Sequence, residues 1–159
     1  ISKLIVHKLF GTLRGKSIAI LGFAFKANTN DTRQSAAIDI SKNLLEEGAN
    51  LIIHDPKVSE DQIFSELGIK PRHNKSITSL NMEEGTWIKE NSLDKSLVNV
   101  DAILILTEWG IYKEIKWEKV EKIIRKPCWV FDTRSIINFN EIKNTDLNFW
   151  RIGDGIIKS

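Results

Sequence analysis

Residues 17–56 read SIAILGFAFKANTNDTRQSAAIDISKNLLEEGANLIIHDP and contain one complete strand–helix–strand pattern. The almost wholly apolar run at 17–22 is typical of a strand that is buried on both faces of a parallel sheet. Apolar residues at helical spacing in 36–47 predict an amphipathic helix, which Gly48 ends as a C-terminal cap. Residues 51–55 predict a second buried strand, stopped by the proline that follows. The two predicted strands therefore run parallel, joined by a crossover helix.

The rest of the chain continues the alternation of strands and helices. Further helices are predicted at 59–67, 93–98 and 117–125, and further strands near Trp87, at 101–107, at 128–132 and, as the last one, at 148–152. This order is typical of an α/β fold in which a doubly wound, mostly parallel, Rossmann-like sheet lies between two helical layers. We therefore expect a three-layer α/β/α domain.

An additional amphipathic helix is predicted at residues 1–13. The residues at helical spacing are Ile1, Leu4, Ile5, Leu9 and Leu13. The apolar face of this helix needs a partner, which is either the sheet of this domain or a region upstream. Because the chain begins with isoleucine rather than methionine, we expect it to be part of a longer protein.

Composition limits the class of protein. The chain has 159 residues, of which 42% are hydrophobic and 28% are charged, and its formal net charge is +2. These values are typical of one soluble globular domain and argue against a disordered chain, a membrane-spanning chain and a strongly basic nucleic-acid-binding surface. The single cysteine, Cys128, excludes an internal disulfide and favours a reducing, cytoplasmic compartment. His7, His54 and His73 lack the spacing of metal ligands, so no metal site is predicted.

Three cationic side chains follow predicted strands and predict an anion site. Ligands of doubly wound sheets bind beyond the carboxyl ends of the strands. Lys26 and Arg33 lie in the loop after the first strand, and Arg134 follows the strand at 128–132. That loop lacks the G-x-G-x-x-G pattern with which a dinucleotide-binding domain cradles phosphate, so an anion would be held mainly by side-chain charge. The alternative for Lys26 and Arg33 is that they are solvated loop charges or partners of Asp31.

Three other residues have a structural interpretation that we favour. Asp55 lies where a dinucleotide-binding domain places the acid that binds ribose, but without the glycines a turn-forming role before Pro56 is favoured. Cys128 lies inside an apolar strand, which favours a small buried hydrophobe over a nucleophile. The five tryptophans are interpreted mainly as core, with Trp109, just past a strand, as a candidate pocket residue.

Four motifs occur in order across nearly the whole chain. They are GFAFKANTNDTR at 22–33, EEGANLIIHDPKV at 46–58, ILTEW at 105–109 and FDTR at 131–134. Together they resemble the C-terminal, UDP-binding domain of the UDP-glucose dehydrogenase family, within the wider UDP-glucose/GDP-mannose dehydrogenases.

The resemblance implies an enzyme that oxidises UDP-glucose to UDP-glucuronate with two NAD. In the family, an N-terminal domain binds NAD, a central region supplies a nucleophilic cysteine, and the C-terminal domain closes over the nucleotide-sugar. Residues 15–159 would then be the C-terminal nucleotide-sugar-binding domain, and residues 1–14 the end of an inter-domain helix. The chain alone is expected to be inactive. Its expected partners are UDP-glucose, the N-terminal and central domains, and further copies in a homo-oligomer, with neither nucleic acid nor membrane.

The same resemblance assigns roles to four residues. Phe25 and Lys26 match the substrate-contacting pair of the family, and Arg134 matches an arginine that contacts substrate. Arg33 matches the arginine that reaches toward the dinucleotide and is the expected cofactor-binding residue. No catalytic residue is expected in this chain. The charge argument selected the same three cations independently.

Two positions depart from the family pattern. Gln34 stands where many relatives have glutamate, which removes a charge beside Arg33. Thr133 stands where glycine is common, so the presentation of Arg134 depends on whether this position needs a positive φ.

Two other functions fit the sequence. One is a dehydrogenase of the same family that acts on UDP-N-acetylmannosamine or GDP-mannose. The other is a non-catalytic regulatory or assembly module that keeps the fold. The forms GFAFK…DTR and TEW favour the UDP-glucose enzyme over the first of these. A sequence upstream of Ile1 without a G-x-G-x-x-G loop and a cysteine-bearing central region would favour the second.

Overall fold

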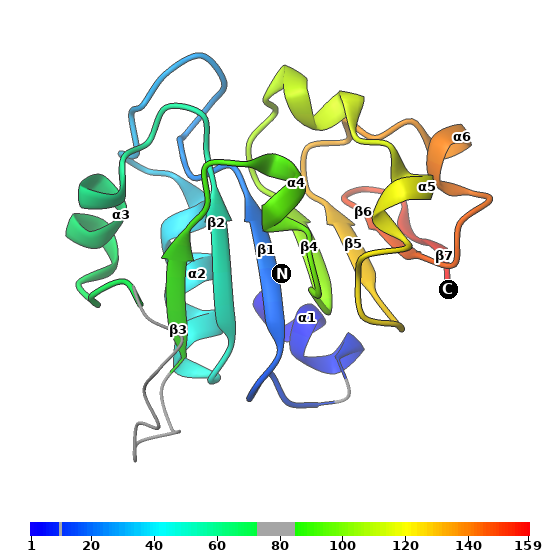
Figure 1. Ribbon diagram of the computed structural model, residues 1–159, viewed down its shortest axis with the longest axis horizontal. Helices are drawn as coiled ribbons and strands as arrows, with labels where there is room; N and C mark the ends of the chain where they lie inside the picture. The colour runs from blue at the N-terminus through cyan, green and yellow to red at the C-terminus, as the bar shows by residue number, and fades with distance from the viewer. Residues whose placement is uncertain (10, 73–84) are drawn as a thin grey trace.

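The structure is a computed structural model that describes residues 1–9, 11–72 and 85–159 (Figure 1). The strands are β1 Ser17–Leu21, β2 Asn50–His54, β3 Thr86–Lys89, β4 Ala102–Ile105, β5 Trp129–Asp132, β6 Asn148–Arg151 and β7 Gly155–Lys158. The helices are α1 Ser2–Lys8, α2 Ala36–Glu46, α3 Glu60–Leu67, α4 Leu93–Ser96, the 3-10 helix η1 Gly110–Glu114, α5 Trp117–Val120 and α6 Phe139–Ile142.

All seven strands form one sheet, in the order β3-β2-β1-β4-β5-β6-β7. Strands β1 to β6 are parallel, and β7 pairs antiparallel with β6. The chain moves outward in one direction from β1 to β3 and in the other from β4 onward, which is the doubly wound arrangement. The predicted mostly parallel, Rossmann-like sheet is confirmed.

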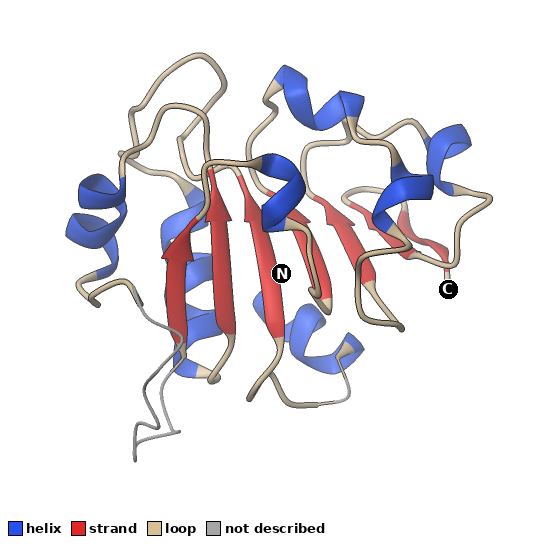
Figure 2. Ribbon diagram, in the orientation of Figure 1, coloured by secondary structure: helices blue, strands red, loops and turns tan. Residues whose placement is uncertain are grey.

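Helices cover both faces of the sheet, so the predicted three layers are present. In the view of Figure 2, α1 and α2 lie behind the strands, while α4 and α5 lie in front of them. The sheet between them is apolar: every residue of β4 and β5 is buried, as is most of β1. None of the helices within the described residues is long and apolar enough to span a membrane.

The helix at the N-terminus is shorter than predicted. It ends at Lys8 rather than near Leu13, and Gly11, at φ +77°, turns the chain away from the helical path. Ile5, Leu9 and Leu13 are nevertheless all buried in the same core as the sheet. Of the two predicted partners for this apolar face, the domain itself is therefore the one observed.

Two further predictions, one of the length of a helix and one of the last strand, are wrong. The helix predicted at 117–125 ends at Val120, because the following residues bond to the segment that precedes β4: the Asn99 N–H donates to the Ile123 carbonyl and the Arg125 N–H to the Val100 carbonyl. The strand at 148–151 is not the last one.

The additional strand, β7, follows a tight turn. Gly153 and Gly155 both have positive φ, +89° and +77°, which lets the chain reverse and pair with β6. The short helices η1 and α6 were likewise not predicted.

Two helix boundaries follow the predicted caps. Ser59 caps α3, and it forms a reciprocal capping box with Gln62. Gly48, just after α2, has φ +83°, as expected for the residue that ends a helix.

Gly22 allows two loops to meet at the carboxyl end of the sheet. It follows β1 with φ +94°, and a Cβ atom added there would lie 2.8 Å from the backbone nitrogen of Thr107, in the loop after β4. Its own N–H donates to the His54 carbonyl at 2.8 Å. The left-handed backbone and the close approach together require glycine.

We predict that Gly22→Ala lowers the free energy of unfolding by about 3 kcal/mol, since it combines backbone strain with overpacking. The measurement is urea denaturation followed by tryptophan fluorescence. Gly110→Ala is the matched control, because Gly110 has no atom within 4 Å of an added Cβ. Similar unfolding midpoints for the two variants would contradict the prediction.

Candidate functional site

The candidate site lies beyond the carboxyl ends of β1, β4 and β5. The strand order reverses between β1 and β4, and this switch point is where doubly wound sheets bind ligands. Three loops form the site: residues 22–35 after β1, residues 106–109 after β4 and residues 133–137 after β5.

A buried carboxylate in the turn after β2 holds the first two of these loops together. Asp55 follows β2 and is only 2% exposed. Its two oxygens accept five hydrogen bonds of 2.8–3.2 Å, from the backbone N–H groups of Phe23, Ala24, Lys57 and Val58 and from the indole Nε1–H of Trp109. The turn-forming role predicted for Asp55 is confirmed. Because the carboxylate faces inward, it is not placed to bind a ribose.

The contacts of Asp55 determine how an anion can be held here. In a dinucleotide-binding domain, the N–H groups that follow the first strand point at the pyrophosphate. In this chain the N–H groups of Phe23 and Ala24 donate to Asp55 instead. The residues present therefore do not fit a dinucleotide cradle, and an anion has to be held by side chains.

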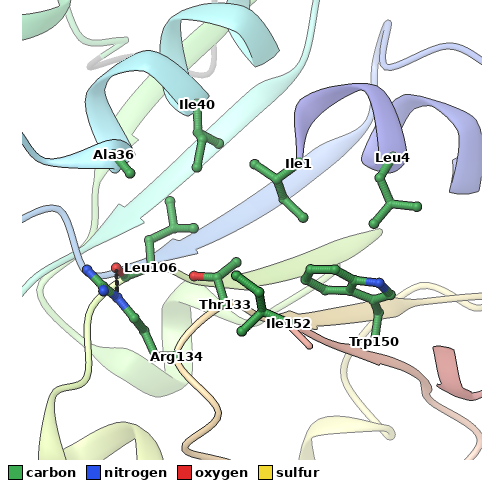
Figure 3. Close-up of a pocket in the computed structure, with 9 residues that line it drawn as sticks. All are labelled: Ile1, Leu4, Ala36, Ile40, Leu106, Thr133, Arg134, Trp150 and Ile152. Carbon is green, nitrogen blue, oxygen red and sulfur yellow. Dashed lines mark hydrogen bonds between the residues drawn. The ribbon is translucent and has the colours of Figure 1, made fainter. Parts of the chain in front are cut away.

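Arg134 joins all three loops. Its Nε–H donates to the Leu106 carbonyl at 2.8 Å, and Nη2 donates to the Phe25 carbonyl at 3.3 Å. The Glu108 carboxylate lies 3.3 Å from Nε. Figure 3 shows Arg134 beside Leu106 at one end of a pocket. Residues 25 and 134 are thus in contact, although 109 positions separate them.

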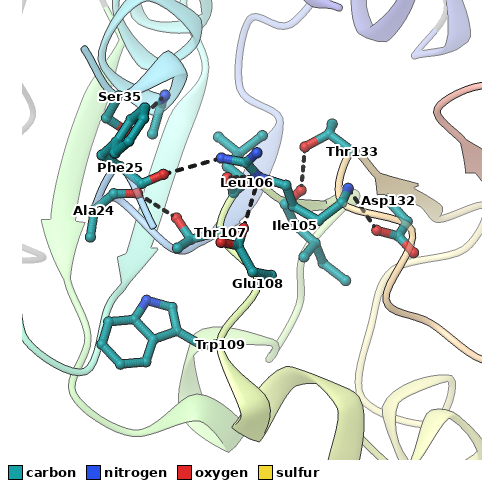
Figure 4. Close-up of polar contacts among 12 residues, drawn as sticks. Ala24, Phe25, Ser35, Ile105, Leu106, Thr107, Glu108, Trp109, Asp132 and Thr133 are labelled. Atoms are coloured by element: carbon teal, nitrogen blue, oxygen red, sulfur yellow. Dashed lines mark hydrogen bonds and ion pairs between the residues drawn. The ribbon is translucent and has the colours of Figure 1, made fainter. Parts of the chain in front are cut away.

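The backbone around Arg134 is supported by Asp132 and Thr133. The buried Asp132 carboxylate accepts the N–H of Arg134 at 3.0 Å and that of Ile137 at 2.9 Å. The Thr133 hydroxyl donates to the Ile105 carbonyl at 2.7 Å (Figure 4). Positive φ occurs at Ser135 and not at Thr133, so threonine in place of glycine causes no backbone strain.

Phe25 and Lys26 lie on the loop that Arg134 contacts. The Phe25 side chain is 45% exposed, which is unusual for a large aromatic residue, and Lys26 is exposed beside it. The Phe25 N–H donates to the Asp31 carbonyl at 2.8 Å and closes the loop behind them. The structure therefore brings Phe25, Lys26 and Arg134 to one side of the crevice.

Arg33 is held differently. Its guanidinium donates to the Asp31 carboxylate through Nε at 2.9 Å and Nη2 at 2.7 Å, and its side chain is 86% exposed. The hydrogen bonds from Arg33 lower the pKa of Asp31 to about 2, and Asp31 raises the pKa of Arg33. The alternative weighed from the sequence, that Arg33 is the partner of Asp31, is the arrangement observed.

A pocket of about 390 Å³ opens next to Arg134. It is lined by Ile1, Leu4, Ala36, Ile40, Leu106, Thr133, Arg134, Trp150 and Ile152. Arg134 is the cationic side chain of this otherwise largely apolar lining (Figure 3). Ala36 is the first residue of α2, so the positive end of that helix also faces the pocket.

The sequence did not assign a role to two features of the site. Glu108 lies next to Arg134, and Trp150 and Ile152 form the far wall of the pocket. Glu108 and Ile152 come shortly after β4 and β6, which is the signal that could have indicated them, whereas Trp150 lies within β6. Trp109 is buried, and its indole bonds to Asp55, so it acts in the framework of the site.

The other buried titratable groups are structural. Burial raises the pKa of the Cys128 thiol to about 12, which confirms the prediction of an inert buried cysteine. Burial lowers the pKa of His54, whose Nδ1 lies 3.0 Å from the Tyr112 hydroxyl. Within the described residues no three His, Cys, Asp or Glu side chains are grouped to hold a metal ion. His73, for which no metal role was predicted, lies outside those residues.

We predict that Asp55→Asn lowers the free energy of unfolding by about 3 kcal/mol. The amide places an NH₂ group where the loops supply only donors, so buried N–H groups lose their acceptor. Urea denaturation measures the change. Asp61→Asn, at an exposed position of α3, is the control and should stay within about 0.5 kcal/mol of wild type. Equal stability of the two variants would refute the role of Asp55.

We also predict that the Asp31 carboxyl titrates near pH 2 in an NMR titration of the folded chain. Because its folded pKa lies below the ordinary 3.8, the stabilisation from its ion pair is fully present above that value and is lost as the pH falls through about 2. Arg33→Ala should return the midpoint toward 3.8, whereas Lys26→Ala should move it much less. Equal shifts in the two variants would show that the hydrogen bonds from Arg33 are not the main cause.

Comparison with known proteins gives one consistent family. Residues 19–139 match the family described as UDP-glucose/GDP-mannose dehydrogenase family, UDP binding domain. The UDP-glucose 6-dehydrogenase of Bos taurus is 38% identical over 151 residues, which cover 94% of this chain and 30% of that protein. UDP-glucose 6-dehydrogenase 4 of Arabidopsis thaliana is 35% identical over 153 residues, which cover 94% of this chain and 32% of that protein. The chain thus spans about a third of the length of these relatives.

Solved structures share the fold. The NDP-N-acetyl-D-galactosaminuronic acid dehydrogenase of Methanosarcina mazei Go1 superposes with a TM-score of 0.71 at 21% identity, over 97% of this chain and 28% of that one. A UDP-glucose dehydrogenase of Pyrobaculum islandicum gives a TM-score of 0.61 at 24% identity, over 92% and 27%. With the loop motifs at the switch point and the family match over most of its length, the chain belongs to the UDP-glucose/GDP-mannose dehydrogenase family and contains its UDP-binding domain.

Proposed function

We propose that this chain is the nucleotide-sugar-binding domain of a cytoplasmic, NAD-dependent UDP-glucose 6-dehydrogenase, which oxidises UDP-glucose to UDP-glucuronate. The identity of 35–38% to UDP-glucose 6-dehydrogenases over 94% of the chain supports UDP-glucose as the substrate. In this proposal residues 15–159 form the binding domain. Residues 1–14 are the end of an inter-domain helix, whose segment α1 packs on the domain.

One observation carries the binding role. Arg134, after β5, contacts the Phe25 carbonyl in the loop after β1, and Lys26 is the next residue of that loop. Two cations from distant parts of the chain are thus brought to one loop at the switch point. A guanidinium has five N–H donors, and Arg134 uses one at Nε and one at Nη2 within the protein. The donors that remain can bind a diphosphate, with Lys26 adding a second charge.

Phe25 supplies the apolar part of the same surface. Its exposed ring gives a ligand a flat surface to pack against, next to the charged groups that neutralise the diphosphate. In this proposal Phe25, Lys26 and Arg134 bind and orient the nucleotide-sugar and take no part in the chemical steps.

The cofactor requires a different part of the enzyme. The loop after β1 has no glycine-rich cradle, and its first N–H groups are used by Asp55. We therefore propose that NAD binds mainly to the N-terminal domain of the enzyme and that the chain alone does not turn over substrate. The exposed Arg33 is the residue proposed to reach toward the dinucleotide. Many relatives have a glutamate beside this arginine where this chain has Gln34, and here the ion pair with Asp31 would set the orientation of Arg33 instead.

The test is calorimetric titration of the chain with UDP-glucose. Lys26→Ala and Arg134→Ala should each weaken binding roughly ten-fold, because each removes a charge-assisted contact with the diphosphate. Lys119→Ala, on α5 at the opposite face of the sheet, is the control and should bind like wild type. Circular dichroism checks that each variant is folded.

The same titration separates the candidate substrates. UDP-glucose should bind more tightly than UDP-N-acetylmannosamine and GDP-mannose. Preference for one of the latter two would assign the chain to a different enzyme of the family. Equal binding of UDP-glucose by wild type, Lys26→Ala and Arg134→Ala would reject the cationic site.

A further inference from the structure

Packing explains two residues of the TEW motif and leaves the third unexplained. The Thr107 hydroxyl donates to the Ala24 carbonyl at 2.7 Å (Figure 4), and the Trp109 indole donates to the buried Asp55 at 3.2 Å. Both side chains are buried. Glu108, between them, has a side chain that is 40% exposed and lies beside Arg134. Thr107 and Trp109 therefore fix the backbone of the loop, and Glu108 faces the candidate site.

The Glu108 carboxylate keeps its capacity to accept hydrogen bonds. It lies 3.3 Å from Nε of Arg134, but the single N–H of that nitrogen donates to the Leu106 carbonyl at the shorter distance of 2.8 Å. The contact between Glu108 and Arg134 is thus an attraction between charges. Across the described part of the chain, no N–H or O–H group forms a hydrogen bond to Glu108, so its oxygens are available to a ligand.

We propose that Glu108 determines specificity by accepting a hydrogen bond from a hydroxyl group of the nucleotide-sugar, while Arg134 binds its phosphate. This inference rests on the proposed function. Lys26 and Arg134 are donors only and suit the phosphate oxygens of the ligand. Hydroxyl groups need an acceptor, and a carboxylate is the strongest one that a protein offers.

The same carboxylate selects against simple phosphates. A ligand that carries phosphate without hydroxyl groups finds Glu108 as a like charge beside Arg134 and gains nothing in return. A nucleotide-sugar offsets that repulsion with its hydroxyl donors. The pair of Glu108 and Arg134 therefore recognises phosphate and hydroxyl together.

The experiment titrates wild type and Glu108→Gln with inorganic pyrophosphate, UDP and UDP-glucose. Glutamine keeps the shape of the side chain and one acceptor oxygen but removes the charge. Binding of UDP-glucose should weaken about ten-fold, as expected for loss of a hydrogen bond to a charged group. Binding of pyrophosphate should tighten about three-fold, because a like charge is removed. Glu118→Gln, at an exposed position of α5, is the control and should change neither value.

The two expected changes, weaker binding of UDP-glucose and tighter binding of pyrophosphate, distinguish this role from a structural one. If Glu108 only oriented Arg134, both ligands would bind more weakly in Glu108→Gln; if it only reduced the local charge, both would bind more tightly, and either result overturns the inference. If the inference holds, the titration with UDP identifies the hydroxyl group that Glu108 binds. Weaker binding of both UDP and UDP-glucose by Glu108→Gln assigns a ribose hydroxyl, and weaker binding of UDP-glucose alone assigns a hexose hydroxyl.

The proposed function is tested separately by the wild-type chain. UDP-glucose that binds wild type no more tightly than pyrophosphate would overturn the proposed function and this inference together. UDP-glucose that binds more tightly than pyrophosphate, but equally to wild type and Glu108→Gln, would overturn this inference alone.

Discussion

The arrangement of the site depends on one buried negative charge. Moving a carboxylate out of water is costly unless hydrogen bonds replace its hydration, and Asp55 accepts five. Its donors come from the loops after β1, β2 and β4, so the charge is satisfied only when these loops hold one relative position. The close approach at Gly22 is part of the same constraint, because it places the loop after β4 against the loop after β1. The crevice is therefore formed before any ligand arrives.

This internal carboxylate also explains why a ligand at this edge of a dinucleotide-type fold has to be held by side chains. The N–H groups of Phe23 and Ala24 occupy the place from which a glycine-rich loop holds a pyrophosphate, but here they donate hydrogen bonds to Asp55. Without that cradle, small residues are no longer needed after β1, and bulky Phe25 and charged Lys26 can follow. The sheet and its switch point are shared with dinucleotide-binding domains, whereas the chemistry of the site is specific to these loops.

The strands and the main helix could be predicted because their residues carry the pattern locally: apolar runs for the strands and a helical period before Gly48. The end of α5 could not, since it depends on a hydrogen bond from Arg125 to Val100, which are distant in the sequence. The site divides in the same way. A cation just after a strand, such as Arg134, is visible in the sequence, whereas the importance of Glu108 comes from its spatial neighbour 26 positions along the chain.

A series of hydrogen bonds through the loop after β1 connects Arg134 to Arg33, although the two side chains bind different partners. Arg134 donates to the Phe25 carbonyl, the Phe25 N–H donates to the Asp31 carbonyl, and the Asp31 carboxylate holds Arg33. The backbone of this one loop thus links the positions of Arg134 and Arg33. Asp31 balances the charge of Arg33, and Glu108 balances part of that of Arg134. Lys26 is then the cation of the three without a carboxylate at ion-pair distance among the residues described, and the Asp31 carboxylate attracts it only from a longer distance.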